Sequence, residues 1–265
     1  MPAFAKSMSV ENLRASKWTA LTVISFGTFM STLDGGMISV SSPALAEALE
    51  TDVSTVLWVT VSYWITAVGL LLTMGWIGDE FGKRRVFIIG SVVFTLGILM
   101  SAVSLNVWHL IGARIFQGIG SAMVLSNLNA LITARFPAEE RGMALGVSGA
   151  VVGAGLSLGP LLGGPLLDLL DWRALFYTRA PLGVLGIVLA WWLLPNDRAV
   201  PNRFRVDIVG TSALFGTLVS ILLIVNQGAK LGFGSTPIIV TAVVTAISLA
   251  VLVWAERRSP RPILD

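Results

Sequence analysis

The sequence predicts an all-α integral membrane protein with eight transmembrane helices, and three observations support this prediction. The chain of 265 residues is 55% hydrophobic and 12% charged, whereas a soluble domain has roughly 25% charged residues. Its mean hydropathy is +0.82. Its apolar residues gather in long runs, and most charged residues lie in the short connectors between them. Together these features exclude an ordinary soluble globular domain.

A helix that crosses the hydrocarbon core needs about 20 mostly apolar residues. Eight runs of the sequence meet this requirement, and their ends follow from the polar connectors. The predicted spans are 18–41, 55–76, 86–104, 107–132, 143–168, 175–195, 206–226 and 236–256.

The charged residues predict how these spans are oriented. Of the 18 lysines and arginines, 14 lie in the terminal segments or in alternate connectors. The positive-inside rule places those segments, and therefore both termini, in the cytoplasm. The high pI of 9.7 reflects this topology, so nucleic-acid binding is not expected. These residues are Lys6, Arg14, Lys17, Lys83, Arg84, Arg85, Arg135, Arg141, Arg198, Arg203, Arg205, Arg257, Arg258 and Arg261.

Several classes of site are absent from the sequence. There is no cysteine, which excludes disulfides, thiolate metal sites and thiol chemistry, and the single histidine, His109, makes no metal cluster. The glycines around the charged stretch "GWIGDEFGKRR" do not have the spacing of a phosphate-binding loop, and no hydroxyl residue follows them. We therefore expect no cofactor and no enzymatic activity.

The stretch from Gly75 to Arg85 predicts a tight cytoplasmic turn between the second and third spans. Gly82 can adopt a positive φ without steric cost, and Gly75 and Gly78 lie on one helix face, where another helix can approach closely. We expect Asp79 to meet a helix N-terminus or an arginine. The alternative is that the basic residues only anchor the topology.

The fourth span contains polar residues on one helical stripe, namely Arg114, Gln117, Gly118, Ser121 and Asn129. An arginine at the centre of a span costs at least about 2.5 kcal/mol, so we expect Arg114 to face a cavity or a partner. The alternative is that it extends along the helix to the outer membrane surface.

The first and fifth spans have features that match this stripe. Asp34 lies near the outer end of the first span, at a depth similar to that of Arg114, so a pair between them is feasible. In the fifth span, Gly155, Gly159 and Gly163 favour close helix packing, and Pro160 removes a backbone donor and is expected to bend the helix. Ordinary tight packing with a kink is the alternative interpretation.

Four motifs resemble signatures of the major facilitator superfamily. The Gly75–Arg85 stretch resembles the loop between its second and third spans, and the fourth span resembles the motif R-x-x-Q-G-x-G-A-A. The first span, with "LD" at 33–34, resembles that of the fourteen-span drug:proton antiporter branch. The fifth span resembles the antiporter signature at all six named positions, which are Gly146, Gly155, Gly159, Pro160, Gly163 and Gly164.

This resemblance implies a fold and a set of roles. Residues 18–195 would form a six-helix N-terminal bundle, built as a 3+3 inverted repeat, and residues 206–256 an additional two-helix hairpin. Segments 1–17, 196–205 and 257–265 would be cytoplasmic. The loop would be a conformational latch, to which Gly75, Asp79, Gly82, Lys83, Arg84 and Arg85 belong.

The chain departs from the family pattern at three positions. Ser39 replaces an asparagine and Gly36 a threonine, which puts the role of those side chains in doubt. Arg179 stands where asparagine is usual. For Arg179 the favoured interpretation is a side chain that extends to the outer membrane surface, and the alternative is contact with an anionic ligand.

The function implied is proton-coupled efflux of small amphipathic or cationic compounds across a plasma membrane, the inner membrane in a bacterium. Asp34 would take up a proton outside and release it inside, a cationic substrate would compete with that proton, and Arg114 and Gln117 would assist. The chain matches only the first half and the extra pair, so we expect either a fragment or a second half or second chain. The alternative is a membrane module, truncated or regulatory, that does not transport.

Overall fold

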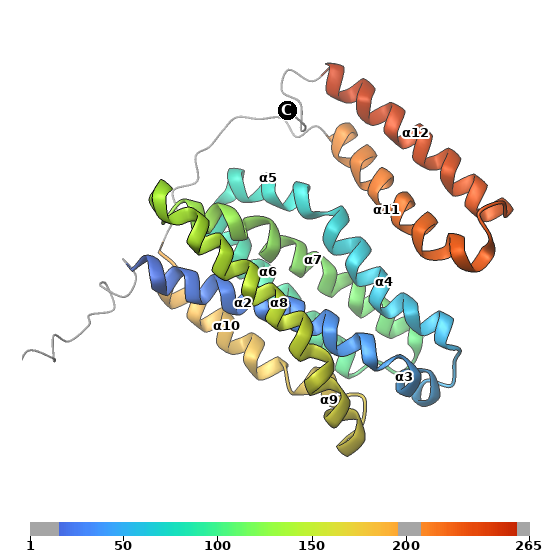
Figure 1. The fold of residues 1–265 in the computed structure, drawn as a ribbon, viewed down its shortest axis with the longest axis horizontal. Helices are drawn as coiled ribbons and strands as arrows, with labels where there is room; N and C mark the ends of the chain where they lie inside the picture. The colour runs from blue at the N-terminus through green and yellow to red at the C-terminus, as the bar shows by residue number, and fades with distance from the viewer. Residues whose placement is uncertain (1–15, 196–207, 259–265) are drawn as a thin grey trace, which may run out of the picture.

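The computed structural model describes residues 16–195 and 208–258, and in these ranges it contains α-helices and no strand (Figure 1). The predicted all-α class is confirmed. The helices are α2 (Lys17–Val40), α3 (Ser42–Ala48), α4 (Val53–Gly69), α5 (Leu71–Phe81), α6 (Lys83–Ala102), α7 (Val107–Thr133), α8 (Ala138–Leu169), α9 (Ala174–Tyr177), α10 (Ala180–Leu193), α11 (Ile208–Leu231) and α12 (Thr236–Arg258).

The predicted spans correspond to these helices with two differences. Within the described residues, six helices are long and apolar enough to cross a membrane, and α4 with α5 makes a seventh if the bent pair is one span. The predicted span 55–76 is therefore broken, with a bend of 46° at Leu70. The predicted span 206–226 corresponds to α11, which contains the apolar stretch Ser212–Val225; positions 206 and 207 lie outside the described residues.

The bend between α4 and α5 occurs where a glycine meets a side chain from a distant part of the sequence. Glycine is one of the residues at which helices kink, and Gly69 is the last residue of α4. A Cβ on Gly69 would lie 2.7 Å from the ring of Phe215 in α11, so the missing side chain admits that ring. The additional hairpin of α11 and α12 is seated against α4 at this point (Figure 1).

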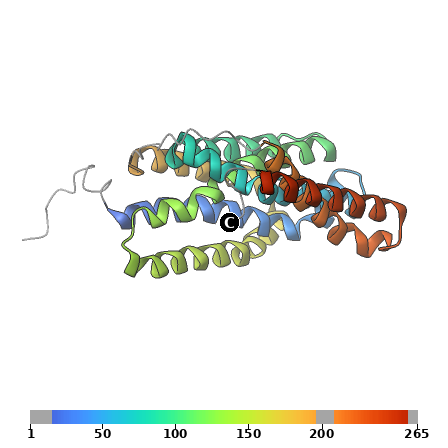
Figure 2. The same cartoon turned by 90° about the horizontal axis from the view of Figure 1, so that it is seen from above.

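Helices α2 to α10 form one bundle, in which α2 contacts α7, α8 and α10. The longest helix, α8, lies along α2 on the outside of the bundle, while α6 and α7 pack against each other (Figure 2). α4 contacts α7, and α10 contacts both α6 and α2. This arrangement brings α2, α7 and the start of α10 together in the interior.

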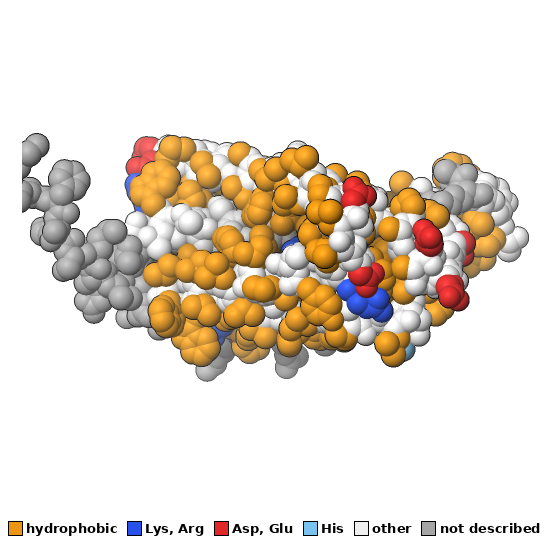
Figure 3. Space-filling model, turned by 90° about the horizontal axis from the view of Figure 1, so that it is seen from below, with side chains coloured by type: hydrophobic (Ala, Val, Ile, Leu, Met, Phe, Trp, Pro, Cys, Tyr) orange, Lys and Arg blue, Asp and Glu red, His pale blue; other side chains and the backbone are white. Residues whose placement is uncertain are grey.

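Two apolar clusters fill the bundle, one toward each end. The first includes Met37, Leu110 and Phe176, and the second includes Ile24, Phe87 and Ile132. The exterior is also apolar: in the face of Figure 3 hydrophobic side chains cover the long middle, and charged ones gather toward the ends. A soluble protein rarely exposes so much continuous apolar surface, so this exterior fits a lipid environment.

Candidate functional site

A buried group of three charged side chains lies inside the first apolar cluster. Asp34 comes from α2, Arg114 from α7, and Arg179 is the residue that precedes α10. The Arg114 Nη1 atom donates a hydrogen bond of 2.5 Å to Asp34 Oδ2, and the Arg179 Nη1 atom donates to Asp34 Oδ1. Their exposed fractions are 0%, 0% and 2%. We call these three residues the charged cluster.

The position of Arg114 agrees with a partner in the interior rather than with the outer membrane surface. Its Nε atom donates to the Val59 carbonyl oxygen at 3.2 Å, and its Nη1 atom also donates to Gln117 Oε1 at 2.6 Å. Its guanidinium carbon lies 4.4 Å from the centre of the Tyr63 ring, a distance typical of a cation–π contact. Asp34, Arg114 and Gln117 are therefore brought together in space.

Arg179 corrects one sequence-based interpretation. We expected its side chain to extend to the outer membrane surface, but it is buried and paired with Asp34. Its Nε atom donates to the Leu175 carbonyl oxygen, and its guanidinium lies 5.3 Å from the Phe176 ring centre. The physical reason is that α9 and the start of α10 turn this residue inward, where the second oxygen of Asp34 accepts its hydrogen bond.

Tyr63 is a site residue that sequence reasoning did not single out. Its hydroxyl lies 2.9 Å from Ser31 Oγ and donates to Ser121 Oγ at 2.8 Å, and the two serine hydroxyls are 2.5 Å apart. This closed set of hydroxyls links α2, α4 and α7 directly below Arg114. The available signal was a phenol within an apolar span, because a buried hydroxyl needs a hydrogen-bond partner.

The stripe on α7 is only partly as predicted. Arg114, Gln117 and Ser121 are buried, but Asn129 is exposed. The buried amide toward the far end of α7 is Asn127, against which α5 packs: a Cβ on Gly78 would lie 1.9 Å from Asn127 Oδ1. The buried amide at this end therefore faces α5 and is separate from the charged cluster.

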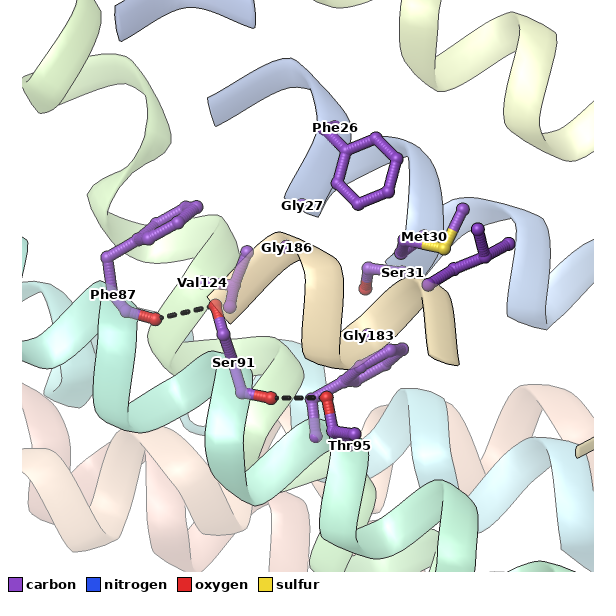
Figure 4. Close-up of a pocket in the computed structure, with 12 residues that line it drawn as sticks. Phe26, Gly27, Met30, Ser31, Phe87, Ser91, Thr95, Val124, Gly183 and Gly186 are labelled. Atoms are coloured by element: carbon purple, nitrogen blue, oxygen red, sulfur yellow. Dashed lines mark hydrogen bonds between the residues drawn. The ribbon is translucent and has the colours of Figure 1, made fainter. Parts of the chain in front are cut away.

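A small cavity lies about one helical turn from the charged cluster, between α2, α6, α7 and α10 (Figure 4). Ser31 lines it on α2, one turn before Asp34, and Gly183 lines it on α10, one turn after Arg179. The other lining residues are mainly apolar; they are Phe26, Gly27, Met30, Phe87, Ser91, Phe94, Thr95, Val124, Leu182 and Gly186.

At the other end of the bundle, the Gly75–Arg85 segment forms the predicted tight turn. Gly82 has a φ of 99° and separates α5 from α6. We predicted that Asp79 contacts an arginine or a helix N-terminus. The ion pair that Asp79 forms is instead with Lys83. Arg84 donates to the carbonyl oxygens of Leu194 and Trp191 at 2.6 Å, at the end of α10.

The remaining positions of this segment differ in how closely they contact other helices. Gly78 allows α5 to approach α7 closely, whereas the atom nearest to a Cβ on Gly75 would be the Ser126 Cβ at 3.8 Å. Arg85 is exposed. Close helix approach is therefore a property of Gly78 much more than of Gly75.

The glycines of α8 divide into two sets. A Cβ on Gly159 would lie 2.5 Å from the Gly36 Cα, and Gly155 and Gly163 are similarly close to Thr32 and Met37 of α2. The predicted close packing is thus found at these three positions. In contrast, a Cβ on Gly146 or Gly164 would have no neighbour within 4 Å. The helix is continuous through Pro160, between Ala138 and Leu169.

Comparison with known proteins gives a consistent result. The family model of the Major Facilitator Superfamily matches residues 24–208. The riboflavin transporter RibZ of Clostridioides difficile is 32% identical over 84% of this chain and 50% of its own length. The puromycin resistance protein pur8 of Streptomyces alboniger is 34% identical over 94% of this chain and 49% of its own length.

A third relative is the multidrug resistance protein Stp of Mycobacterium tuberculosis, 32% identical over 92% of this chain and 46% of its own length. The chain therefore spans about half the length of the relatives it matches.

Proposed function

The chain belongs to the major facilitator superfamily, and on this premise we propose that it is part of a proton-coupled exporter of small amphipathic molecules. The family assignment makes it a membrane transport protein and not an enzyme. The observation on which this proposal depends is the charged cluster, because it places a carboxylate with no exposed surface in the interior of the bundle. Relatives named as puromycin and multidrug resistance proteins support export of such compounds.

The coupling step that we propose is a change of partners at Asp34. While Asp34 is ionised, it accepts one hydrogen bond from each arginine and holds α2 against α7 and α10. A proton on Asp34 removes its negative charge and weakens both ion pairs in a low-dielectric interior. The two guanidinium groups are then free to change partners, which favours a different arrangement of the three helices.

The proposed architecture follows the sequence-based expectation. Residues 18–195 would be the N-terminal bundle, residues 206–256 an additional hairpin, and both termini would be cytoplasmic, in a plasma membrane. Because the chain spans about half the length of the relatives it matches, the remainder of the transport path would come from a second half or a second chain. In this arrangement the Gly75–Arg85 segment would act as the cytoplasmic latch, and Arg84 would tie it to α10.

The glycines of α8 would have a separate role. Gly155, Gly159 and Gly163 hold α8 against α2, which is the helix that contains Asp34. We therefore propose that this contact transmits a change at Asp34 to the long helix on the outside of the bundle. Gly146 and Gly164 would meet other parts of the transporter, because nothing in the described residues covers them.

Flux measurements test the proposal. The chain is reconstituted into liposomes that contain a pH-sensitive dye, a pH gradient is imposed, and movement of ethidium and of dansylglycine is followed together with internal pH. With a second copy of the chain completing the transport path in the liposome membrane, we expect substrate flux that requires the gradient and is accompanied by proton movement. Asp34→Asn should abolish the proton-coupled component and leave membrane insertion unchanged.

The matched control is Asp171→Asn, since the Asp171 carboxylate is 58% exposed and pairs with Arg173 outside the cluster. Asp171→Asn should transport like the unchanged chain. Full coupled flux in Asp34→Asn would refute the role of this carboxylate. Insertion with no flux in the unchanged chain would instead favour the alternative, a membrane module that does not transport by itself.

A further inference from the structure

The charged cluster is not neutral. Two guanidinium groups face one carboxylate, which leaves one formal positive charge at a site where every member is at least 98% buried. Within the described residues, Asp34 is the only carboxylate that pairs with either arginine. A buried charge without a counter-charge is strongly unfavourable. The cluster therefore lacks one negative charge.

The unused hydrogen-bond donors point to the same deficit. Arg114 Nη2, Arg179 Nη2 and Gln117 Nε2 are buried and have no hydrogen-bond partner. Buried polar atoms in folded proteins are nearly always satisfied, so such a group of unsatisfied atoms calls for an explanation. All three atoms are donors, and they belong to side chains that are already connected through Arg114 and Asp34.

The residues around the cluster add no negative charge. Tyr63 uses its hydroxyl in the bonds with Ser31 and Ser121. Arg179 precedes the first residue of α10, and the N-terminal end of a helix contributes a partial positive charge. Apolar residues of the first core cluster, among them Leu175 and Phe176, enclose the rest. The surroundings thus favour an anion and disfavour a cation.

We infer that the charged cluster is a binding site for an anionic group, and that this chain prefers amphipathic substrates with a carboxylate or a similar single negative charge over cationic ones. This inference deepens the proposed function and rests on it, because it names the class of substrate. With Asp34 ionised, one bound anionic group brings the formal charge of the cluster to zero. Its oxygens would accept hydrogen bonds from the unsatisfied donors.

The nearby cavity marks the direction in which the rest of such a molecule would lie; its volume of about 20 Å³ admits little more than one water, so binding requires the surrounding helices to separate there. The cavity begins one turn away on both α2 and α10, and Phe26, Met30 and Leu182 are among its apolar lining residues (Figure 4). The combination selects a molecule with a small anionic end and an apolar body.

A matched set of dansyl compounds tests this inference. Purified chain in a non-ionic detergent is titrated with dansylglycine, its neutral methyl ester and the cationic dansylcadaverine, and dansyl fluorescence reports binding. We expect dansylglycine to bind about tenfold more tightly than either of the others, the size of effect that one charge-assisted hydrogen bond produces. Equal or tighter binding of dansylcadaverine would overturn the inference.

Substitutions locate the preference. Arg179→Gln should remove the preference for dansylglycine, whereas Arg173→Gln, at a partly exposed arginine that pairs with Asp171, should retain it. If Arg179→Gln does not fold, Asp34→Asn provides the second variant: it adds one positive charge to the cluster and should strengthen dansylglycine binding. A preference that neither variant alters would also overturn the inference.

Two further measurements separate the possible sources of the anion and the two proposals. Sodium chloride and sodium gluconate are added separately at equal concentration: displacement of dansylglycine by chloride indicates a site that takes a small inorganic anion, and displacement by gluconate alone indicates a site that takes an organic carboxylate. Flux of ethidium with no preference for dansylglycine would reject this inference and keep the proposed function. A preference for dansylglycine without any flux would keep this inference and reject the proposed function.

Discussion

Two groups of charged side chains lie at opposite ends of the bundle, and they differ in almost every physical respect. At one end, Asp34, Arg114 and Arg179 come from three helices and are buried in an apolar core. At the other, Asp79 and Lys83 flank a single turn, and the Asp79 side chain is 64% exposed. Both groups contain an ion pair.

Their surroundings make these ion pairs different. Water and dissolved salt screen the exposed pair, so its contribution to stability is small. The buried cluster is not screened, and each of its members depends on the others for compensation of its charge. The difference shows that the contribution of a charged residue to stability depends on its burial and on how far its partners compensate its charge.

The largest expected effect comes from removal of the shared carboxylate. Asp34→Ala leaves two buried guanidinium groups without a counter-charge and should lower the free energy of unfolding by about 3–5 kcal/mol. Asp79→Ala should lower it by less than about 0.5 kcal/mol. Denaturation of the purified chain in detergent measures both. Similar losses for the two variants would contradict the comparison.

A smaller effect is expected where α8 supports the buried end. Gly159→Ala places a Cβ 2.5 Å from the Gly36 Cα, and such overpacking against backbone should cost about 2–3 kcal/mol. Gly146→Ala, in the same helix but without a neighbour within 4 Å, should instead gain up to about 1 kcal/mol. The same denaturation measurement applies, and a loss of stability in both variants would show that α8 does not distinguish its two faces.

The stability of the turn between α5 and α6 is expected to depend more on backbone conformation than on charge. Gly82→Ala forces a side chain into a φ of 99° and should cost about 1–2 kcal/mol. This loss should exceed that of Asp79→Ala in the same turn. If the order were reversed, the ion pair and not the glycine would determine the stability of this end.

The smallest effect separates burial from location. Asp52 lies in the connector before α4, at the same end as Asp34, but it is fully exposed to solvent. Hydrogen bonds from Ser54 and Thr55 lower the pKa of Asp52 from 3.8 to about 2. Because this pKa is lowered, Asp52 stabilises the folded chain above pH 4, and the stabilisation disappears as the pH falls toward 2.

The comparison of the unchanged chain with Asp52→Ala at pH 6, 5, 4 and 2 measures this effect. The difference in stability should be constant between pH 6 and pH 5, shrink below pH 4 and be least at pH 2. A difference that did not change with pH would show that the hydrogen bonds of Asp52 do not depend on its charge. A loss of stability in Asp52→Ala as large as that in Asp34→Ala would mean that the position of a carboxylate in the bundle, rather than its burial, determines its contribution to stability.

Much of the fold could be predicted from the sequence because the spans are set by hydrophobicity. The runs of apolar residues gave the helices, and the positive φ of Gly82 and the close contacts of Gly155 and Gly159 followed from the need for a missing side chain. The break at Leu70 could not be predicted in this way. It depends on Phe215, a residue almost 150 positions away, as a packing partner of α4.

The site was only partly predictable for a similar reason. Depth along the spans indicated that Asp34 and Arg114 were able to meet, and they do. Arg179 lies at the end of a span, where extension to the membrane surface is a reasonable expectation for an arginine. The direction of its side chain is decided by the way α9 and α10 turn and by the free oxygen of Asp34, which only the assembled bundle provides.

The contact between α2 and α8 has a mechanical consequence. At Gly155, Gly159 and Gly163 the surface of α8 is bare backbone, so no side chain of these residues interlocks with α2. A displacement of α8 along α2 therefore requires no rotamer change at Gly159, where backbone meets backbone, whereas at Gly155 the Thr32 side chain of α2 would have to move. The glycines thus hold α8 close to α2, while displacement along the helix axes is opposed mainly by Thr32.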